Sequence, residues 1–329
     1  MSNETMPACE TPATAKPSLG RRLWNFPVTR ILAYLLLFAG LCLVFGLALG
    51  LPVGLALTAA HIPFRQGSEV WALLGESVMA LAAVGAFLLM GLWADRRSPA
   101  ALGLERRGLA RDTAMGLLLG GGVFSVVIGL MAALGAYHVG GINAHFQPLI
   151  PLLLFLAVAV CEETIFRGYI FQTLEARWGS GIALAVSAVL FGLVHLGNPV
   201  GGLTPGLRLV GPVFIVFEAS ILMTAGYLLT RRLWLPIGIH WGWNFFESAV
   251  YGTSDSGFGA SPVYMLLRSH VSGLFPVTGG PFGPEASVIC LVVSTGAGLL
   301  LLRQAVLKGQ WRPRRRSTHS HLSNLEVNP

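Results

Sequence analysis

Apolar residues fill most of this chain in long blocks that alternate with short polar connections. The blocks cover about residues 31–58, 70–93, 113–137, 148–174, 181–197, 210–229, 234–252 and 286–303. A helix needs about 20 apolar residues to cross a hydrocarbon core of about 30 Å. The pattern therefore predicts an all-α, polytopic integral membrane helix bundle with about eight transmembrane helices.

Composition also indicates that lipid is the main solvent of the chain. Hydrophobic residues make up 54% of the sequence and charged residues only 11%, whereas soluble domains carry about 25% charged residues. The four cysteines, Cys9, Cys42, Cys161 and Cys290, show no C-x-x-C spacing. Neither a disulfide scaffold nor a cysteine-based zinc site is indicated.

Lysine and arginine are distributed unevenly about the predicted helices. When the connections are assigned to alternating sides, the poor side receives only Arg65, Arg208 and Arg268, and the other side almost all the rest. This bias predicts that both termini are cytoplasmic, and the short connections suit a bacterial cytoplasmic membrane. Topology and anionic lipid headgroups explain the net charge of +7, so we expect the lipid bilayer and no nucleic acid as a partner.

This topology divides the chain into five parts. Residues 1–29 are predicted to form a cytoplasmic N-terminal tail and residues 30–145 the first transmembrane helices. Residues 146–252 form a core that holds the polar residues described next, and 253–307 an external loop with the last transmembrane helix. Residues 308–329 form a basic cytoplasmic tail. Within the loop, the amphipathic stretch 264–267 indicates a surface or re-entrant segment.

Polar side chains inside the predicted spans are costly unless they have partners or a function. Glu163 and Arg167 are spaced i, i+4 and are expected to form an ion pair on one helical face. Glu162 points about 100° away from that face and is left free. The alternative is that all three charges form a structural clamp between helices.

Two further polar sites lie in later spans. Glu162 and His195 are similarly far from a tight turn predicted at 179–181, so an antiparallel helix pair would bring them level. His240 and Asn244 share one helical face at i, i+4 spacing. That pair would hold an oxyanion or a metal, or it would form an ordinary interhelical hydrogen bond.

Three segments together resemble a known family. The segment 162–167, Glu-Glu-Thr-Ile-Phe-Arg, is similar to an E-E-x-x-x-R motif, 191–195 to F-x-x-x-H, and 240–244 to H-x-x-x-N/D. These motifs, in this order and spacing, resemble those of the CAAX prenyl endopeptidase and bacteriocin-processing family of intramembrane proteases. The similarity covers about residues 148–250. It implies cleavage of peptide bonds near the membrane surface, in eukaryotic relatives after the prenylated cysteine of a CAAX tail.

The resemblance predicts an intramembrane endopeptidase acting on membrane-associated, lipidated (CAAX-like) or leader-bearing peptides. Hydrolysis by water needs a base, a proton donor for the leaving amine and polar groups facing the oxyanion. We assign these roles to Glu162, to His195, and to His240 with Asn244, with Glu163 and Arg167 in support. Glu162, His195 and His240 would also supply a two-His-one-carboxylate zinc site, so zinc is a minor alternative as cofactor.

The sequence is also compatible with two other classes of protein. A non-proteolytic membrane scaffold or bacteriocin-immunity protein would use the same polar residues as contacts between helices. A proton-coupled transporter is suggested by Glu218 and Glu247, two intramembrane carboxylates with no catalytic role in the scheme above. The residues do not distinguish a prenylated from an unmodified substrate.

Overall fold

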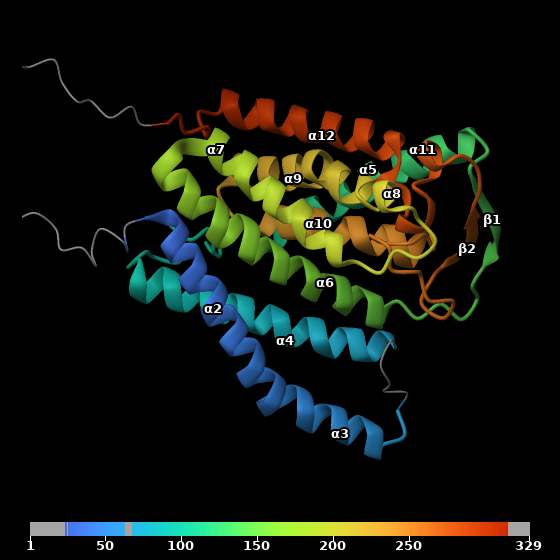
Figure 1. Cartoon of the computed structure of the whole chain (residues 1–329), viewed down its shortest axis with the longest axis horizontal. Helices are drawn as coiled ribbons and strands as arrows, with labels where there is room; N and C mark the ends of the chain where they lie inside the picture. The colour runs from blue at the N-terminus through green and yellow to red at the C-terminus, as the bar shows by residue number, and fades with distance from the viewer. Residues whose placement is uncertain (1–23, 25, 63–67, 315–329) are drawn as a thin grey trace, which may run out of the picture.

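The structure is a computed structural model that describes residues 24, 26–62 and 68–314. Most helices follow one long axis and form a bundle, with α2 and α3 on one side and α12 on the opposite side (Figure 1). The predicted N-terminal tail, residues 1–29, lies almost wholly outside the described residues, and so do residues 315–329 of the predicted C-terminal tail.

The α-helices are joined by π-helical and 3-10 segments and by one pair of strands. In chain order the elements are α2 (Pro27–Phe45), η1 (Gly46–Gly50), α3 (Leu51–Ala59), α4 (Glu69–Leu88), η2 (Leu89–Ala94), α5 (Leu109–Ala133), β1 (Tyr137–Ile142), α6 (Leu149–Glu163), η3 (Thr164–Ile170), α7 (Phe171–Val194), η4 (His195–Gly197), α8 (Pro205–Arg208), α9 (Val210–Thr230), α10 (Trp234–Asn244), η5 (Phe245–Val250), β2 (Leu267–Val271), α11 (Phe275–Thr278), η6 (Gly280–Phe282), η7 (Pro284–Ala286) and α12 (Val288–Leu307).

Each of the predicted apolar blocks coincides with a helical segment. Six helical runs in the described part of the chain are long and apolar enough to cross a membrane. One of them, Leu149–Gly197, has 49 residues, and its backbone leaves the helical conformation at Gly179 (φ 81°, ψ 169°). It therefore holds both the fourth and the fifth predicted spans. The seventh block corresponds to α10, with 11 residues, continued by the 6 residues of η5.

Glycines bring α5 and α10 into direct backbone contact. A Cβ added at Gly120 would lie 2.0 Å from the carbonyl oxygen of Ile239, and one at Gly242 would lie 2.2 Å from that of Leu117. Both helices repeat glycine at a spacing of four residues, the pattern that lets membrane helices approach closely. This contact fixes the position of α10, which carries two of the predicted site residues.

A small antiparallel sheet at one end of the bundle was not predicted. Strand β1 pairs with β2, with Tyr137 opposite Val271 and Ile142 opposite Leu267. The side-chain amide of Asn143 donates hydrogen bonds to backbone oxygens of the segment that leads into β2. The stretch 264–267 therefore leads into a strand, and the all-α bundle carries this two-stranded sheet as an addition.

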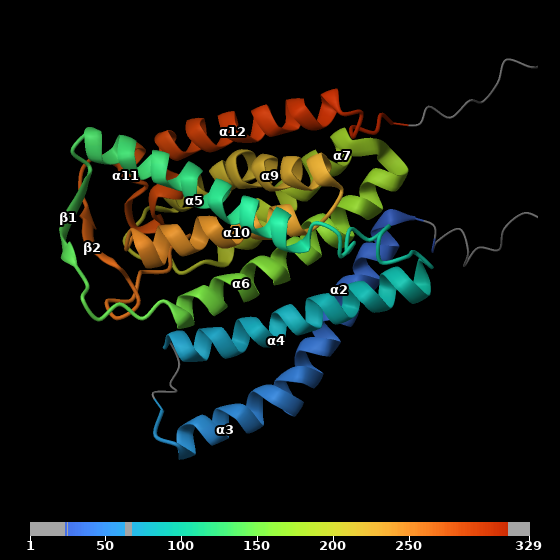
Figure 2. The same cartoon turned by 180° about the vertical axis from the view of Figure 1, so that it is seen from behind.

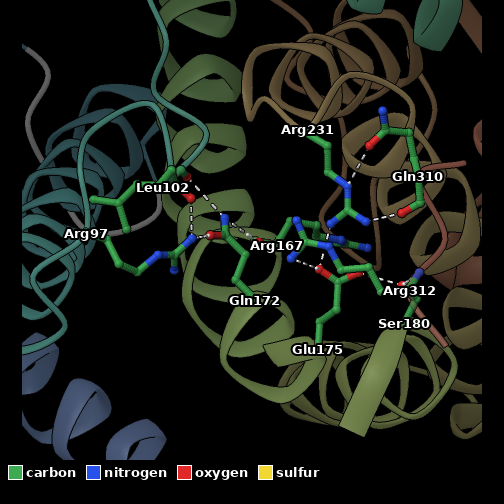
Figure 3. A network of polar contacts seen from close by, with 10 residues as sticks. Arg97, Leu102, Arg167, Gln172, Glu175, Ser180, Arg231, Gln310 and Arg312 are labelled. Atoms are coloured by element: carbon green, nitrogen blue, oxygen red, sulfur yellow. Dashed lines mark hydrogen bonds and ion pairs between the residues drawn. The ribbon is translucent and has the colours of Figure 1, made fainter. Parts of the chain in front are cut away.

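A polar network joins the turn at Gly179 to the segment that follows α12 (Figure 3). Glu175 forms ion pairs with Arg231 at 2.6 Å and Arg312 at 3.4 Å. Ser180 donates through its backbone N–H to the Arg312 carbonyl at 2.8 Å, and its Oγ accepts from the Arg312 N–H at 2.9 Å. The start of the predicted C-terminal tail is thus held against the connection between the fourth and fifth spans.

The first helical run has the least contact with the rest of the bundle. Only 11% of its most apolar window is buried, and α3 stands away from the other helices in both views (Figures 1 and 2). Its exposed side chains include Leu47, Leu51 and Leu55. A surface of this kind is suited to contact with lipid.

Candidate active site

The two adjacent glutamates lie in the last turn of α6. The seven residues that follow, Thr164–Ile170, form the π-helical segment η3, a distortion that is frequent at functional sites. The side chain of Glu163 is fully buried, whereas that of Glu162 is 28% exposed. The neighbouring carboxylates therefore have different surroundings, as expected from the 100° rotation between successive helical residues.

Glu163 forms the predicted ion pair with Arg167. The Oε1 atom of Glu163 lies 3.0 Å from Nη1 of Arg167, and both side chains are buried. The guanidinium group also lies 4.6 Å from the centre of the Phe191 ring and donates to the Ser220 carbonyl at 3.4 Å. Among the described residues, no lysine or arginine forms an ion pair with Glu162, so the predicted difference between the two glutamates is confirmed.

His240 lies between the two glutamates. Its Nδ1 is 3.0 Å from Oε1 of Glu163, and its Nε2 is 3.7 Å from Oε2 of Glu162. A carboxylate at Nδ1 fixes the ring orientation and keeps the proton on that nitrogen. The Nε2 atom is thereby directed toward Glu162, a contact between motifs that the sequence spacing did not predict.

His195 is oriented by the backbone of its own helix. Its Nδ1 lies 2.7 Å from the carbonyl oxygen of Phe191, one turn earlier, and its ring packs edge-on against the Phe191 ring at 4.9 Å between centroids. Because Nδ1 donates to this carbonyl, Nε2 is the nitrogen free for other contacts.

One pocket of about 640 Å³ brings the four predicted catalytic residues together. Glu162, His195, His240 and Asn244 all line it. The end of α6 and the start of η4, directly after the part of α7 that follows the Gly179 turn, therefore present Glu162 and His195 to the same space. The volume lies in the range of small-molecule and cofactor sites, roughly 300–1,000 Å³.

The pocket also contains acidic residues that sequence reasoning missed. Glu76 of α4, Asp255 of the loop after η5, and Glu285 of η7 line the same pocket. Glu76 could have been found, because it is a carboxylate inside the second apolar block. Asp255 and Glu285 lie in a polar loop, and only the folding of that loop onto the bundle brings them to the pocket.

The three residues predicted as an alternative zinc site are not gathered around one point. In the part of the chain that the structure describes, the three carboxylates Glu247, Asp255 and Glu285 have ligand atoms that all lie within 4.8 Å of one another. Glu162, His195 and His240 are not brought together in this way, although His240 and Glu162 are close.

The fold and the pocket define a polytopic membrane protein with a buried carboxylate–histidine site. Residues 143–246 match the model of the Rce1-like family, described as type II CAAX prenyl endopeptidase Rce1-like. This match covers about a third of the chain, coincides with the segment that carries the three motifs, and supports in general terms a membrane endopeptidase of the CAAX-protease type. No curated protein and no solved structure matches the chain significantly.

Proposed function

We propose that the protein is an intramembrane endopeptidase that hydrolyses peptide bonds with water activated by Glu162. One observation carries the proposal. The Glu162 carboxylate lies 3.7 Å from the imidazole of His240, in a pocket that also contains His195 and Asn244. Among the described residues, no lysine or arginine forms an ion pair with it. A carboxylate in this situation accepts a proton from water and so acts as a general base.

Each of the other groups supplies a different part of the reaction. Glu162 takes a proton from water as the oxygen attacks the carbonyl carbon. The oxyanion formed accepts hydrogen bonds from Nε2–H of an imidazolium at His240 and from the amide of Asn244. Carboxylates on both sides of His240 stabilise that positive charge. When the C–N bond breaks, His195 in its protonated form donates a proton from Nε2 to the leaving amine.

The surroundings favour a membrane-associated substrate. The pocket wall includes Leu154, Phe155, Val158 and Ile215 beside the polar groups, so an apolar or lipidated peptide fits it. We propose CAAX-like or leader-bearing peptides as the substrate class and the bacterial cytoplasmic membrane, with both termini cytoplasmic, as the location.

The first test compares the wild type with Glu162→Gln. Both proteins, purified in detergent, are incubated with a peptide library that includes farnesylated CAAX tails, and new termini are identified by mass spectrometry. Because the amide cannot take up the proton, we expect cleavage to fall by about 10² to 10⁴. The matched control is Glu105→Gln, which removes the same charge outside the pocket and should cleave like the wild type.

The same assay separates the proposal from its alternatives. A scaffold or immunity protein predicts no cleavage by the wild type and an unchanged cellular phenotype for a folded Glu162→Gln variant. A zinc mechanism predicts stoichiometric zinc in the purified protein and loss of cleavage after chelation. Activity that persists in a metal-free preparation excludes that mechanism.

A further inference from the structure

A second cluster of carboxylates lies beside the candidate active site. Glu247 belongs to η5, directly after the helix with His240, whereas Asp255 lies in the following loop and Glu285 in η7 before α12. One oxygen from each of the three side chains lies within 4.8 Å of the others. The end of one helix, the loop that follows it and the segment before α12 therefore converge on one point through acidic groups.

Hydrogen bonds satisfy only some of the oxygens in this cluster. The indole Nε1 of Trp243 donates to Oε2 of Glu247 at 3.0 Å and to Oε1 of Glu285 at 3.1 Å. Ser256 donates through Oγ to the other oxygen of Glu285. Among the described residues, the remaining oxygen of Glu247, Oε1, has no hydrogen-bond partner, although the residue is fully buried. A buried acceptor without a donor is costly, and a positively charged ligand would remove that cost.

The negative charge of the cluster has no cationic partner in the described structure. No lysine or arginine of the described chain forms an ion pair with Glu247, Asp255 or Glu285. Buried charges in proteins are normally paired or bound to a metal.

We propose that Glu247, Asp255 and Glu285 bind one hard divalent cation of the size of Ca²⁺. Such ions take oxygen ligands at about 2.3–2.6 Å, so two ligand oxygens on one ion are at most about 5 Å apart. The three ligand oxygens all lie within 4.8 Å of one another, which is inside this limit. Ca²⁺ also accepts an irregular set of carboxylates, whereas Mg²⁺ demands near-octahedral geometry at about 2.0–2.1 Å.

A small ion fits the position better than a cationic side chain of a substrate does. Asp255 and Glu285 line the pocket, whereas Glu247 is not among its lining residues and is completely buried. An ion that enters from the pocket can pass between the first two carboxylates and reach the third. A lysine or arginine side chain would remain on the pocket side and leave Glu247 unpaired.

The bound cation would join the loop to the helix that carries the site. Glu247 is one turn beyond Asn244, and Trp243 contacts two of the three carboxylates. The ion would therefore hold the loop around Asp255 and the start of α12 against this part of the pocket wall. Its binding requires no turnover, so its test is independent of the proposed hydrolysis.

The test measures binding of radioactive Ca²⁺ to the intact, chelator-stripped protein in detergent. We expect one Ca²⁺ per chain with a Kd within the range of about 10⁻⁷ to 10⁻³ M known for oxygen-ligand sites, and weaker binding of Mg²⁺. Added Ca²⁺ should also raise the melting temperature, because it binds the folded state alone. Glu247→Gln and Glu285→Gln should each weaken binding at least about tenfold.

The control is Glu69→Gln, which changes a carboxylate of the same pocket outside the cluster and should bind Ca²⁺ like the wild type. The proposal is overturned if the wild type takes up no Ca²⁺ at millimolar concentration, or if Glu247→Gln and Glu285→Gln bind it equally well. Cleavage of lysine-containing peptides that depends on Glu285, with no Ca²⁺ bound, would instead assign the cluster to substrate recognition.

Discussion

At the scale of single residues, Glu163 has two contacts that explain why the motif has adjacent glutamates. Its Oε1 atom lies 3.0 Å both from Nη1 of Arg167 and from Nδ1 of His240. Arg167 compensates the buried charge, and the carboxylate orients the imidazole. In the proposed mechanism Glu163 is therefore a positioning residue, whereas Glu162 lines the pocket.

Removing the Glu163 carboxylate should affect stability and catalysis by separate routes. In Glu163→Gln, Arg167 is left buried without its counter-charge, which typically costs about 3–5 kcal/mol. In Glu163→Gln/Arg167→Met that uncompensated charge is gone, so much of the stability should return. Cleavage should stay at least about tenfold below the wild type in both variants, because His240 has lost the group that orients it.

Thermal unfolding in detergent and kcat for the best peptide substrate give the two readouts. A double variant that regains both stability and kcat would show that Glu163 acts only as the partner of Arg167. Loss of kcat with stability restored supports the positioning role.

At the scale of elements, the position of α10 depends on its contact with α5. This packing holds His240 and Asn244 opposite α6, and it relies on glycines because any side chain at the contact would meet backbone atoms. The π-helical segments η3 and η5 begin directly after the motif residues of α6 and α10. Helix packing and local helix geometry therefore both act on the same pocket.

Gly120→Ala should separate these two helices. The new Cβ would lie 2.0 Å from the carbonyl oxygen of Ile239, and overpacking of this kind costs about 1–3 kcal/mol. Gly122→Ala on the same helix is the matched control, because no neighbouring atom of the described residues lies within 4 Å of the added Cβ and alanine favours a helix. We expect a lower melting temperature and weaker cleavage for the first variant only. Equal melting temperatures would contradict the close helix contact.

At the scale of the whole molecule, basic residues gather at one end of the bundle. Arg97, Arg231 and Arg312 come from three separate connections and take part in one network around Gln172 and Glu175 (Figure 3). The uneven distribution of arginine along the sequence therefore corresponds to a concentration of arginine at one end of the folded bundle. The strands β1 and β2 lie at the opposite end (Figures 1 and 2).

The predicted orientation can be tested with single cysteines in a background without the four native ones. Ser98→Cys lies beside the basic connection after α4, and Val139→Cys lies on β1, where the native side chain is 52% exposed. The positive-inside rule places Ser98 in the cytoplasm. A membrane-impermeant maleimide should therefore label Val139→Cys in intact cells and Ser98→Cys only after permeabilisation. The reverse pattern would place both termini outside.

The sequence by itself determined the helical bundle, the pairing of Glu163 with Arg167, and the similarity to the CAAX-protease family over residues 143–246. These depend on local information: the length of apolar blocks, the i, i+4 spacing and short motifs. It did not predict the sheet, because β1 and β2 are far apart in the chain and each is short.

Only the tertiary structure decided what surrounds the site. The contact of Glu163 with His240, the presence of Glu76 in the pocket, and the convergence of Glu247 with Asp255 and Glu285 all join separate segments. The physical reason is that such contacts depend on how helices rotate and pack against one another. Spacing along one helix fixes which residues share its face, but only packing fixes what that face meets.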